Sequence, residues 1–315
     1  MTAAEGAARI VRDCVRVKAE ETVAIITDSL RPPDIARQLF LASIAQKATC
    51  VQLMFDGNLP SEALPDLVSN SIETSDVVFC ITTQTLGYAP ATAACIRRGG
   101  RVITMTEAPE DFLTNPALNA DFDALKGTIL AVQTAFDQGH QVHVTAPGGT
   151  DLTFRIAGRQ SRCCTGTCSS PGIMAAVPDM EVYIAPLEGT AEGTLVADLS
   201  ATGLGLLEQP VTLSIHNGRA EKISGNKQAE ALWQRVRRVS GGDVLAEFAV
   251  GLNPNAKPCG SIVIDEGIYG TGHFALGSNT GFGGRNACTQ HLYLVYWKPT
   301  IWLDQTLFMK DGALC

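Results

Sequence analysis

Short apolar runs alternate with amphipathic stretches over the first 139 residues. Strands are predicted where β-branched and other apolar residues run together, and helices where apolar positions recur about every 3.6 residues. Strands are expected at residues 22–27, 50–55, 76–81 and 101–105, and helices at 32–46 and 90–98. Strands separated by helices imply parallel βαβ units. The pattern therefore predicts an α/β domain with a parallel sheet over residues 1–139.

The pattern changes after a helix expected at 121–138, which ends at Gly139. Two alternating runs, 140–145 and 151–156, flank a glycine-containing turn and predict a hairpin, not another βαβ unit. Further strands are expected at 181–185, 193–198 and 211–215, and an amphipathic helix near 226–238. Residues 140–315 are therefore predicted to form an α+β domain rich in antiparallel sheet.

The net charge and the lack of a glycine-rich phosphate motif disfavour two kinds of ligand. The 315 residues are 45% hydrophobic and 18% charged, and the formal net charge is -8, which disfavours nucleic acid because phosphate binding needs clustered Lys and Arg. The basic stretch 235–238 follows a helical pattern, typical of a solvated face. No G-x-G-x-x-G follows the first strand, where Thr27 to Leu30 stand instead. We therefore expect no nucleotide cofactor, and a first domain that walls the substrate cleft.

Targeting signals are not apparent in the sequence. Residues 1–6 have neither a basic nor an apolar character, and no uncharged apolar run approaches the roughly 20 residues that cross a bilayer. Ten cysteines spread over a chain of this length fit reduced thiols. We expect a cytoplasmic protein with no membrane partner.

Four polar residues of the second half lie within apolar or glycine-rich segments. Glu181 opens the run Val182 to Ala185, and Glu247 is a lone carboxylate within residues 245–251. The other two are histidines, His273 and His291, on either side of a glycine-rich segment. A carboxylate in an apolar strand is costly unless it is paired or binds a metal. The set has the composition of a zinc, manganese or iron(II) site with nitrogen and oxygen ligands.

Other interpretations of these residues stay open. Each of the four can instead make an ordinary buried hydrogen bond, and their spacing matches no compact zinc motif. The remaining histidines, His140, His143 and His216, flank turns and are expected at the surface. A cysteine cluster, Cys163, Cys164 and Cys168, offers thiols, but no second Cys or His pair completes a structural zinc site and sequence does not place a histidine base beside it.

Several segments together resemble the aminopeptidase T family of metallopeptidases. They are residues 177–194, 247–256, 273–280 and 298–304, and the resemblance is dense from about residue 171 to 312. It implies that Glu181, Glu247, His273 and His291 belong to a two-metal peptidase centre. The family continues His-Leu-Asp, with the Asp a further ligand, whereas this chain has His291-Leu292-Tyr293. A phenol cannot bridge two ions as a carboxylate does, so one divalent ion per chain is expected.

The same segments are similar to the iron-dependent 2,5-dihydroxypyridine 5,6-dioxygenase. That family uses a His-His-Asp set, and the matching positions here are Glu247, His291 and Tyr293, so one of the three ligands is retained. Its substrate-contacting histidine aligns with Tyr88, which is therefore a candidate substrate-binding residue. A homodimer is what the resemblance implies.

Three hypotheses follow. The first is a metal-dependent hydrolase of a small amide or short peptide, in which Glu181 acts as general base and Tyr293 donates a hydrogen bond to the developing oxyanion. The second is a mononuclear iron(II) dioxygenase that cleaves a hydroxylated aromatic or heteroaromatic ring with Glu247, His273 and His291 as ligands. The third is a relative that has lost its metal and binds a small molecule or partner.

Overall fold

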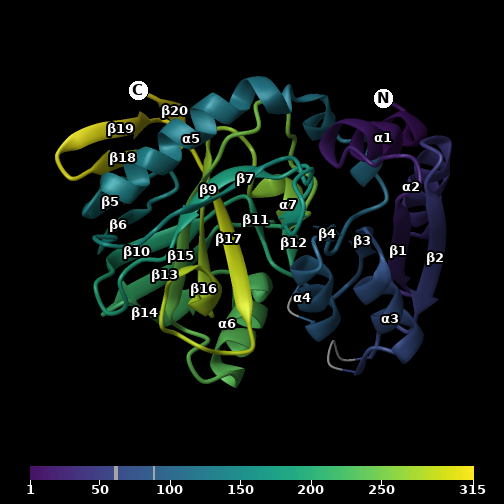
Figure 1. The fold of residues 1–315 in the computed structure, drawn as a ribbon. Coiled ribbons are helices and arrows are strands. Elements are labelled where there is room, and N and C mark those ends of the chain that lie inside the picture. Colours follow the sequence, from purple (N-terminus) through teal and green to yellow (C-terminus); the bar gives the residue numbers. More distant parts are fainter. Residues whose placement is uncertain (60–62, 88) are drawn as a thin grey trace. The chain divides into compact units, whose positions relative to one another are not determined.

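The protein was analysed as a computed structural model that describes residues 1–59, 63–87 and 89–315. The chain divides into two compact units. Unit 1 contains Met1–Phe122 and Cys164–Asp179, and unit 2 contains Asp123–Cys163 and Met180–Cys315. Figure 1 shows the course of the chain through both units.

Unit 1 is built on a five-stranded parallel sheet with the order β2-β1-β3-β4-β8. Its strands are β1 (Thr22–Asp28), β2 (Thr49–Phe55), β3 (Val77–Ile81), β4 (Arg101–Thr104) and β8 (Met174–Ala176). Its helices are α1 (Ala3–Arg9), η1 (Ile10–Cys14), α2 (Pro33–Ala45), α3 (Asp66–Thr74), α4 (Pro90–Arg97), η3 (Phe112–Thr114) and η4 (Pro116–Asn119).

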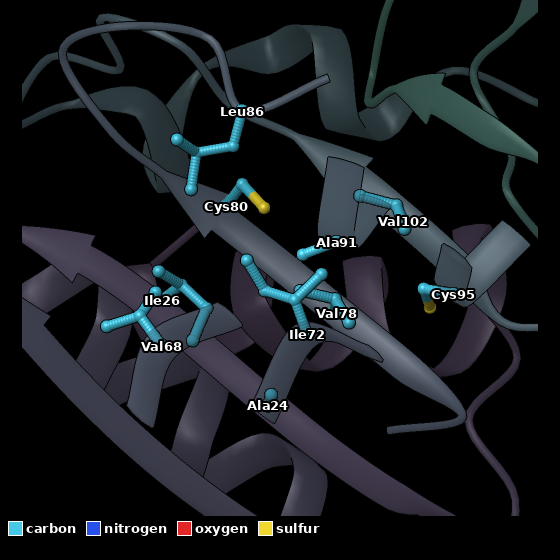
Figure 2. Packing of buried hydrophobic residues seen from close by; sticks show 10 residues of the cluster. All are labelled: Ala24, Ile26, Val68, Ile72, Val78, Cys80, Leu86, Ala91, Cys95 and Val102. Carbon is cyan, nitrogen blue, oxygen red and sulfur yellow. The ribbon is translucent and has the colours of Figure 1, made fainter. Parts of the chain in front are cut away.

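The core of unit 1 is apolar where strands and helices meet. Ile26 of β1 and Val78 of β3 lie side by side with Val68 and Ile72 of α3, and all four side chains are buried (Figure 2). A fully buried strand such as β3 shows a continuous apolar run, because both faces of a parallel sheet are covered. The strand was predicted from this run.

Unit 2 contains two antiparallel sheets. One has eight strands in the order β14-β13-β10-β6-β5-β18-β19-β20, and the other has seven in the order β12-β11-β17-β16-β15-β9-β7. The strands of the first are β5 (Gln141–Thr145), β6 (Asp151–Arg155), β10 (Glu192–Ala197), β13 (Val211–His216), β14 (Arg219–Ser224), β18 (Thr300–Leu303), β19 (Thr306–Lys310) and β20 (Ala313–Leu314). Those of the second are β7 (Arg162–Thr165), β9 (Met180–Ile184), β11 (Ser200–Ala201), β12 (Gly205–Leu206), β15 (Leu245–Gly251), β16 (Thr271–Gly277) and β17 (His291–Trp297).

Aromatic side chains join the two sheets of unit 2. Phe154 of β6 contacts Phe248 of β15 and Phe274 of β16, with ring centroids 5.0 and 5.6 Å apart. Phe136 of helix α5 (Phe122–Gln138) stacks on Phe248 at 5.5 Å. The helices α6 (Lys227–Arg238), α7 (Ile262–Asp265) and η5 (Thr280–Phe282) complete the unit. One face of the seven-stranded sheet is therefore committed to the core, and its other face is available for chemistry.

The predicted fold class is confirmed: a parallel α/β sheet comes first and an antiparallel-rich α+β region follows. The strand β8 was not predicted. β8 lies beyond residue 139 in the sequence, yet it pairs in parallel with β4 and completes the sheet of unit 1. Among the described residues, no helix is long and apolar enough to cross a membrane.

Candidate metal centre

Four neighbouring strands of the seven-stranded sheet, β17, β16, β15 and β9, carry the candidate ligands (Figure 1). Ala275 of β16 lies directly opposite Glu247 of β15 and Tyr293 of β17. Paired residues point to the same face of a sheet, and so do residues two positions apart on one strand. His273 and His291 therefore share the face of Glu247 and Tyr293.

Glu181 reaches the same face from β9. It lies opposite Gly251, which is four positions after Glu247 on β15. On this face of β15, Glu247 is followed by Ala249 and Gly251, so small residues lie next to the candidate ligands. Four strands thus bring two carboxylates and two imidazoles to one face, opposite the aromatic core.

A β-bulge directs Glu247 to this face. Leu245 pairs with Leu276, yet Glu247, two positions later, pairs with Ala275, only one position away on β16. An extra residue in one strand reverses which face the following side chains occupy. Simple alternation from Leu245 would have placed the carboxylate on the core side.

The four side chains lie in contact. His273 Nε2 is 3.3 Å from Glu181 Oε2 and 3.3 Å from Glu247 Oε1. His291 Nε2 is 3.2 Å from the other oxygen of Glu247, Oε2. Ligand atoms of Glu181, Glu247 and His273 all lie within 4.8 Å of one another, and these three residues are buried. Glu247 therefore contacts both imidazoles, each through a different oxygen.

These distances also match the spacing of ligand atoms around one cation. Charge-assisted N–H···O bonds are usually about 2.7–2.9 Å long, shorter than the three contacts observed. Nitrogen and oxygen ligands held about 2.1 Å from one ion are separated by about 3.0–3.4 Å at octahedral or tetrahedral angles. The donor set, all nitrogen and oxygen, suits zinc, manganese or iron(II).

The electrostatics of Glu247 and His291 are strongly linked. Burial alone would raise the pKa of Glu247, but hydrogen bonds and charge from His273 and His291 hold it well below its usual value. Burial alone would lower the pKa of His291, but the Glu247 carboxylate outweighs this and raises it. Glu247 is therefore a carboxylate at neutral pH, as a metal ligand must be.

The loop between β16 and β17 orients His291. The Nδ1 atom of His291 lies 2.8 Å from the carbonyl oxygen of Ser278, so Nδ1 carries the proton and donates it. A backbone acceptor at one ring nitrogen leaves the lone pair of Nε2 directed at the site. The edge of Phe282, in the same loop, meets the His291 ring at a centroid distance of 5.9 Å.

Tyr293 lies beside both histidines. Its ring centroid is 4.6 Å from that of His291 and 5.6 Å from that of His273, in edge-to-face arrangements. Phe282 also contacts Tyr183, which shares the face of Glu181, at 5.4 Å. Tyr183, Phe282 and Tyr293 are each only partly buried. The donor cluster is thus bordered by aromatic rings that are not committed to the core.

Sequence reasoning placed the four donors but missed the groups around them. Ser278 acts through its backbone, which no side-chain pattern reveals, and Phe282 and Tyr183 look like ordinary apolar positions. Tyr88, the candidate substrate-binding residue, lies outside the described residues.

Burial disfavours the thiolate form of two of the three clustered cysteines. Burial raises the pKa of Cys168 to about 12, and its thiol lies 3.6 Å from the carbonyl oxygen of Val102 in unit 1. Burial also raises the pKa of Cys163. Cys163 and Cys164 lie on β7 and are half-buried. No disulfide joins any of the ten cysteines, all of which are among the described residues.

Comparison with known proteins supports the resemblances expected from the sequence. The 2,5-dihydroxypyridine 5,6-dioxygenase of Pseudomonas putida KT2440 is 25% identical over 279 residues, which cover 84% of this chain and 76% of that protein. The solved structure of the Pseudomonas putida dioxygenase superposes with a TM-score of 0.80 at 20% identity, covering 99% of this chain and 96% of that one. Wild-type AmpT from Thermus thermophilus gives a TM-score of 0.73 at 16% identity, over 99% and 98%.

The two solved structures share the fold with this chain, and both relatives named from the sequence are found. A family model described as NicX, 2,5-dihydroxypyridine 5,6-dioxygenase, matches residues 7–315, which is nearly the whole chain. The chain therefore belongs to the 2,5-dihydroxypyridine 5,6-dioxygenase family.

Proposed function

We propose that this protein is an iron(II)-dependent dioxygenase that opens the ring of a small hydroxylated aromatic or heteroaromatic compound, such as a dihydroxypyridine. The observation that carries the proposal is the placement of Glu247 between His273 and His291, each with Nε2 on a different carboxylate oxygen. Two histidines and one carboxylate are the ligand set of mononuclear iron(II) oxygenases. Family membership favours this chemistry over hydrolysis.

Each residue of the proposed site has its own role. Glu247, His273 and His291 would hold the ion, which when bound supplies activation of dioxygen toward an electron-rich ring. The Ser278 carbonyl keeps the proton of His291 on Nδ1, so that Nε2 offers a lone pair. Glu181 Oε2, 3.3 Å from His273 Nε2, is a carboxylate oxygen suited to accept the proton of a substrate hydroxyl.

The aromatic border suits a planar substrate. Tyr183, Phe282 and Tyr293 present partly exposed rings beside the donors. Aromatic rings pair with one another in stacked or edge-to-face geometry, which adds about 0.5–1.5 kcal/mol beyond the buried area. A flat, hydroxylated ring can therefore be held by its faces while its oxygen atoms point to the donors.

A metal-dependent hydrolase of a small amide or peptide is the second candidate. It is favoured by Glu181, a buried carboxylate beyond the two-histidine, one-carboxylate set. A metal site with such a spare carboxylate can activate water, with Glu181 as general base and Tyr293 as donor to the oxyanion.

Oxygen uptake separates the two candidates. Metal-free protein is loaded anaerobically with iron(II), zinc or manganese and offered a panel of hydroxylated pyridines and benzenes. We expect oxygen consumption and loss of the ring absorbance with the iron(II) form alone, with one dioxygen used per ring opened. Hydrolysis of aminoacyl amides by the zinc or manganese form, without oxygen uptake by any form, would reject the oxygenase and support the hydrolase.

A further inference from the structure

The loop that orients His291 is fastened by a single carboxylate from another part of unit 2. Glu188 follows β9, and its Oε1 accepts a hydrogen bond from Asn279 Nδ2 at 3.0 Å and from the Arg285 backbone N–H at 2.7 Å. The acceptor lies 91 and 97 residues before these donors in the sequence. One oxygen atom thus joins the two ends of the segment 279–285.

An arginine completes the fastening. Arg159, which follows β6, forms an ion pair through one guanidinium nitrogen with Glu188 Oε2 and donates through another to the carbonyl oxygen of Gly283. Its side chain is 9% exposed, and that of Glu188 27%. A planar guanidinium suits this task, because it presents several donors in fixed directions.

Within the loop, Asn279 connects Glu188 to the backbone of Asn286. It is 1% exposed, and its Oδ1 accepts the Asn286 backbone N–H at 2.8 Å. Gly284 packs so closely on Asn279 that a β-carbon there would come within 1.9 Å of its Cγ. The loop from Ser278 to Asn286 is therefore held by side-chain hydrogen bonds at both of its ends.

We propose that Glu188, with Arg159, is a positioning residue for the metal centre: it fixes the loop whose Ser278 carbonyl holds the Nδ1 proton of His291 and whose Phe282 ring confines the imidazole. Glu188 contacts Asn279, Arg285 and Arg159, and acts on the metal centre through this loop. The inference rests on the proposed metal centre but not on which reaction that centre performs. Burial would raise the pKa of Glu188, yet the hydrogen bonds and the arginine lower it, so it is charged at neutral pH.

The test is Glu188→Gln, which keeps the size of the side chain but removes its charge. The matched control is Glu192→Gln, four residues on, whose carboxylate likewise accepts a backbone N–H, from Asn217, and pairs with His216. Metal affinity is measured for zinc and for iron(II) by competition with a chelator. We expect a loss of about 10–100-fold in Glu188→Gln, the usual result of disturbing the partners of metal ligands, and no change in Glu192→Gln.

A second measurement reports directly on the imidazole of His291. The zinc-loaded protein, labelled with 15N at its five histidines, gives ring signals that distinguish Nδ1–H from Nε2–H, and His291→Gln identifies the signal of His291. In Glu188→Gln the His291 Nδ1–H signal should broaden or exchange with solvent faster. Metal affinity and a His291 signal equal to those of Glu192→Gln would overturn the proposal.

Arg159→Lys keeps the test decisive if Glu188→Gln does not fold. A lysine retains the charge beside Glu188 but, with a single ammonium, does not reach Gly283 as well. A smaller loss of metal affinity in the same direction is expected, and unchanged affinity would contradict the proposal. Wild-type protein that binds metal without consuming oxygen would reject the oxygenase and leave this role of Glu188 standing.

Discussion

The buried strands of the two units differ in the kinds of side chain that they contain. In unit 1, all five positions of β3 are buried and all are apolar. In unit 2, all seven positions of β15 and all seven of β16 are buried, yet they include Glu247 and His273. Removing a charged group from water costs several kcal/mol unless other charges or a ligand compensate it. β15 and β16 therefore carry a cost that β3 avoids.

The comparison shows that burial alone does not explain the donor cluster. Unit 1 reaches the same degree of burial with Ile26, Val78 and similar side chains (Figure 2). A cation site, in contrast, needs a carboxylate in contact with imidazoles, as Glu247 of β15 is. The β-bulge before Glu247 directs this carboxylate to the face that carries the histidines. A division between a packing unit and a chemical unit predicts different effects for substitutions in each.

The largest effect is expected for Glu247→Gln. The change keeps the shape of the side chain but removes the charge that both imidazoles face. Because changes to the partners of metal ligands already cost about 10–100-fold in affinity, loss of this central ligand should cost more than about 100-fold. Chelator competition and elemental analysis measure the change, and turnover should fall to the level of metal-free protein.

Ile26→Ala provides the contrast in unit 1. Removing a fully buried isoleucine should lower the free energy of unfolding by about 2–5 kcal/mol, seen as a lower melting temperature. Metal affinity of the folded protein should stay at the wild-type value. If Ile26→Ala lost metal as fully as Glu247→Gln, the two units would not be separable in function.

The next effect concerns Tyr293. If its hydroxyl donates a hydrogen bond to the reacting substrate, Tyr293→Phe should lower kcat by roughly 10²–10³, the usual result of removing such a donor. Metal content should not change, since the ring still packs beside His291 and His273. Unchanged kcat would assign Tyr293 a packing role only.

Tyr293→Asp asks a different question at the same position. A carboxylate there would lie beside His291, opposite Ala275 and on the face of Glu247. It should raise the number of metal ions per chain above one, measured by elemental analysis. Two tightly bound ions in the unmodified protein would show that the tyrosine does not limit the stoichiometry.

Much of this arrangement was accessible from sequence, for a physical reason. Strands such as β1 and β3 bury both faces, so their composition alone identifies them. Glu181, Glu247, His273 and His291 were predicted as a group because an ionisable residue in an apolar segment is costly. The structure brings all four together, and their role as ligands stays a prediction.

Other features depend on long-range pairing that no local pattern encodes. β8 has three residues and joins a sheet whose other strands precede it by about 70 residues or more. The bulge before Glu247 is visible only from its register with β16. Glu188 looks like a solvated acid after a strand until Arg285, 97 residues later, is placed beside it.

The pH dependence of metal-free protein gives a smaller effect. The pKa of Glu247 is held below its ordinary 4.5, so its stabilising charge is present above that pH and is lost as the pH falls. The pKa of His291 is raised above 6.5, so its contribution is present below that value and is lost as the pH rises through the raised pKa. Metal-free protein should therefore melt highest between about pH 4.5 and 6.5.

Added metal should raise the melting temperature most on the alkaline side of this pH profile. An ion takes the place of the proton on His291, so the rise in melting temperature on adding metal should grow with pH. Thermal melts with and without metal measure this, and His291→Gln should flatten the alkaline limb. A metal-free profile that rises steadily above pH 7 would contradict the assigned direction for His291.

The smallest effect is expected for Cys168, which tests whether unit 1 contributes any thiol chemistry. Burial raises the pKa of Cys168 to about 12, so the reactive thiolate is scarce at neutral pH. An alkylating reagent should therefore modify the exposed Cys315 and leave Cys168 intact, as mass spectrometry of the peptides would show. Cys168→Ala should leave kcat and metal affinity at their wild-type values, because its thiol lies against the Val102 carbonyl within the packed core of unit 1. Loss of turnover in Cys168→Ala with a wild-type melting temperature would mean that this residue of unit 1 takes part in the reaction.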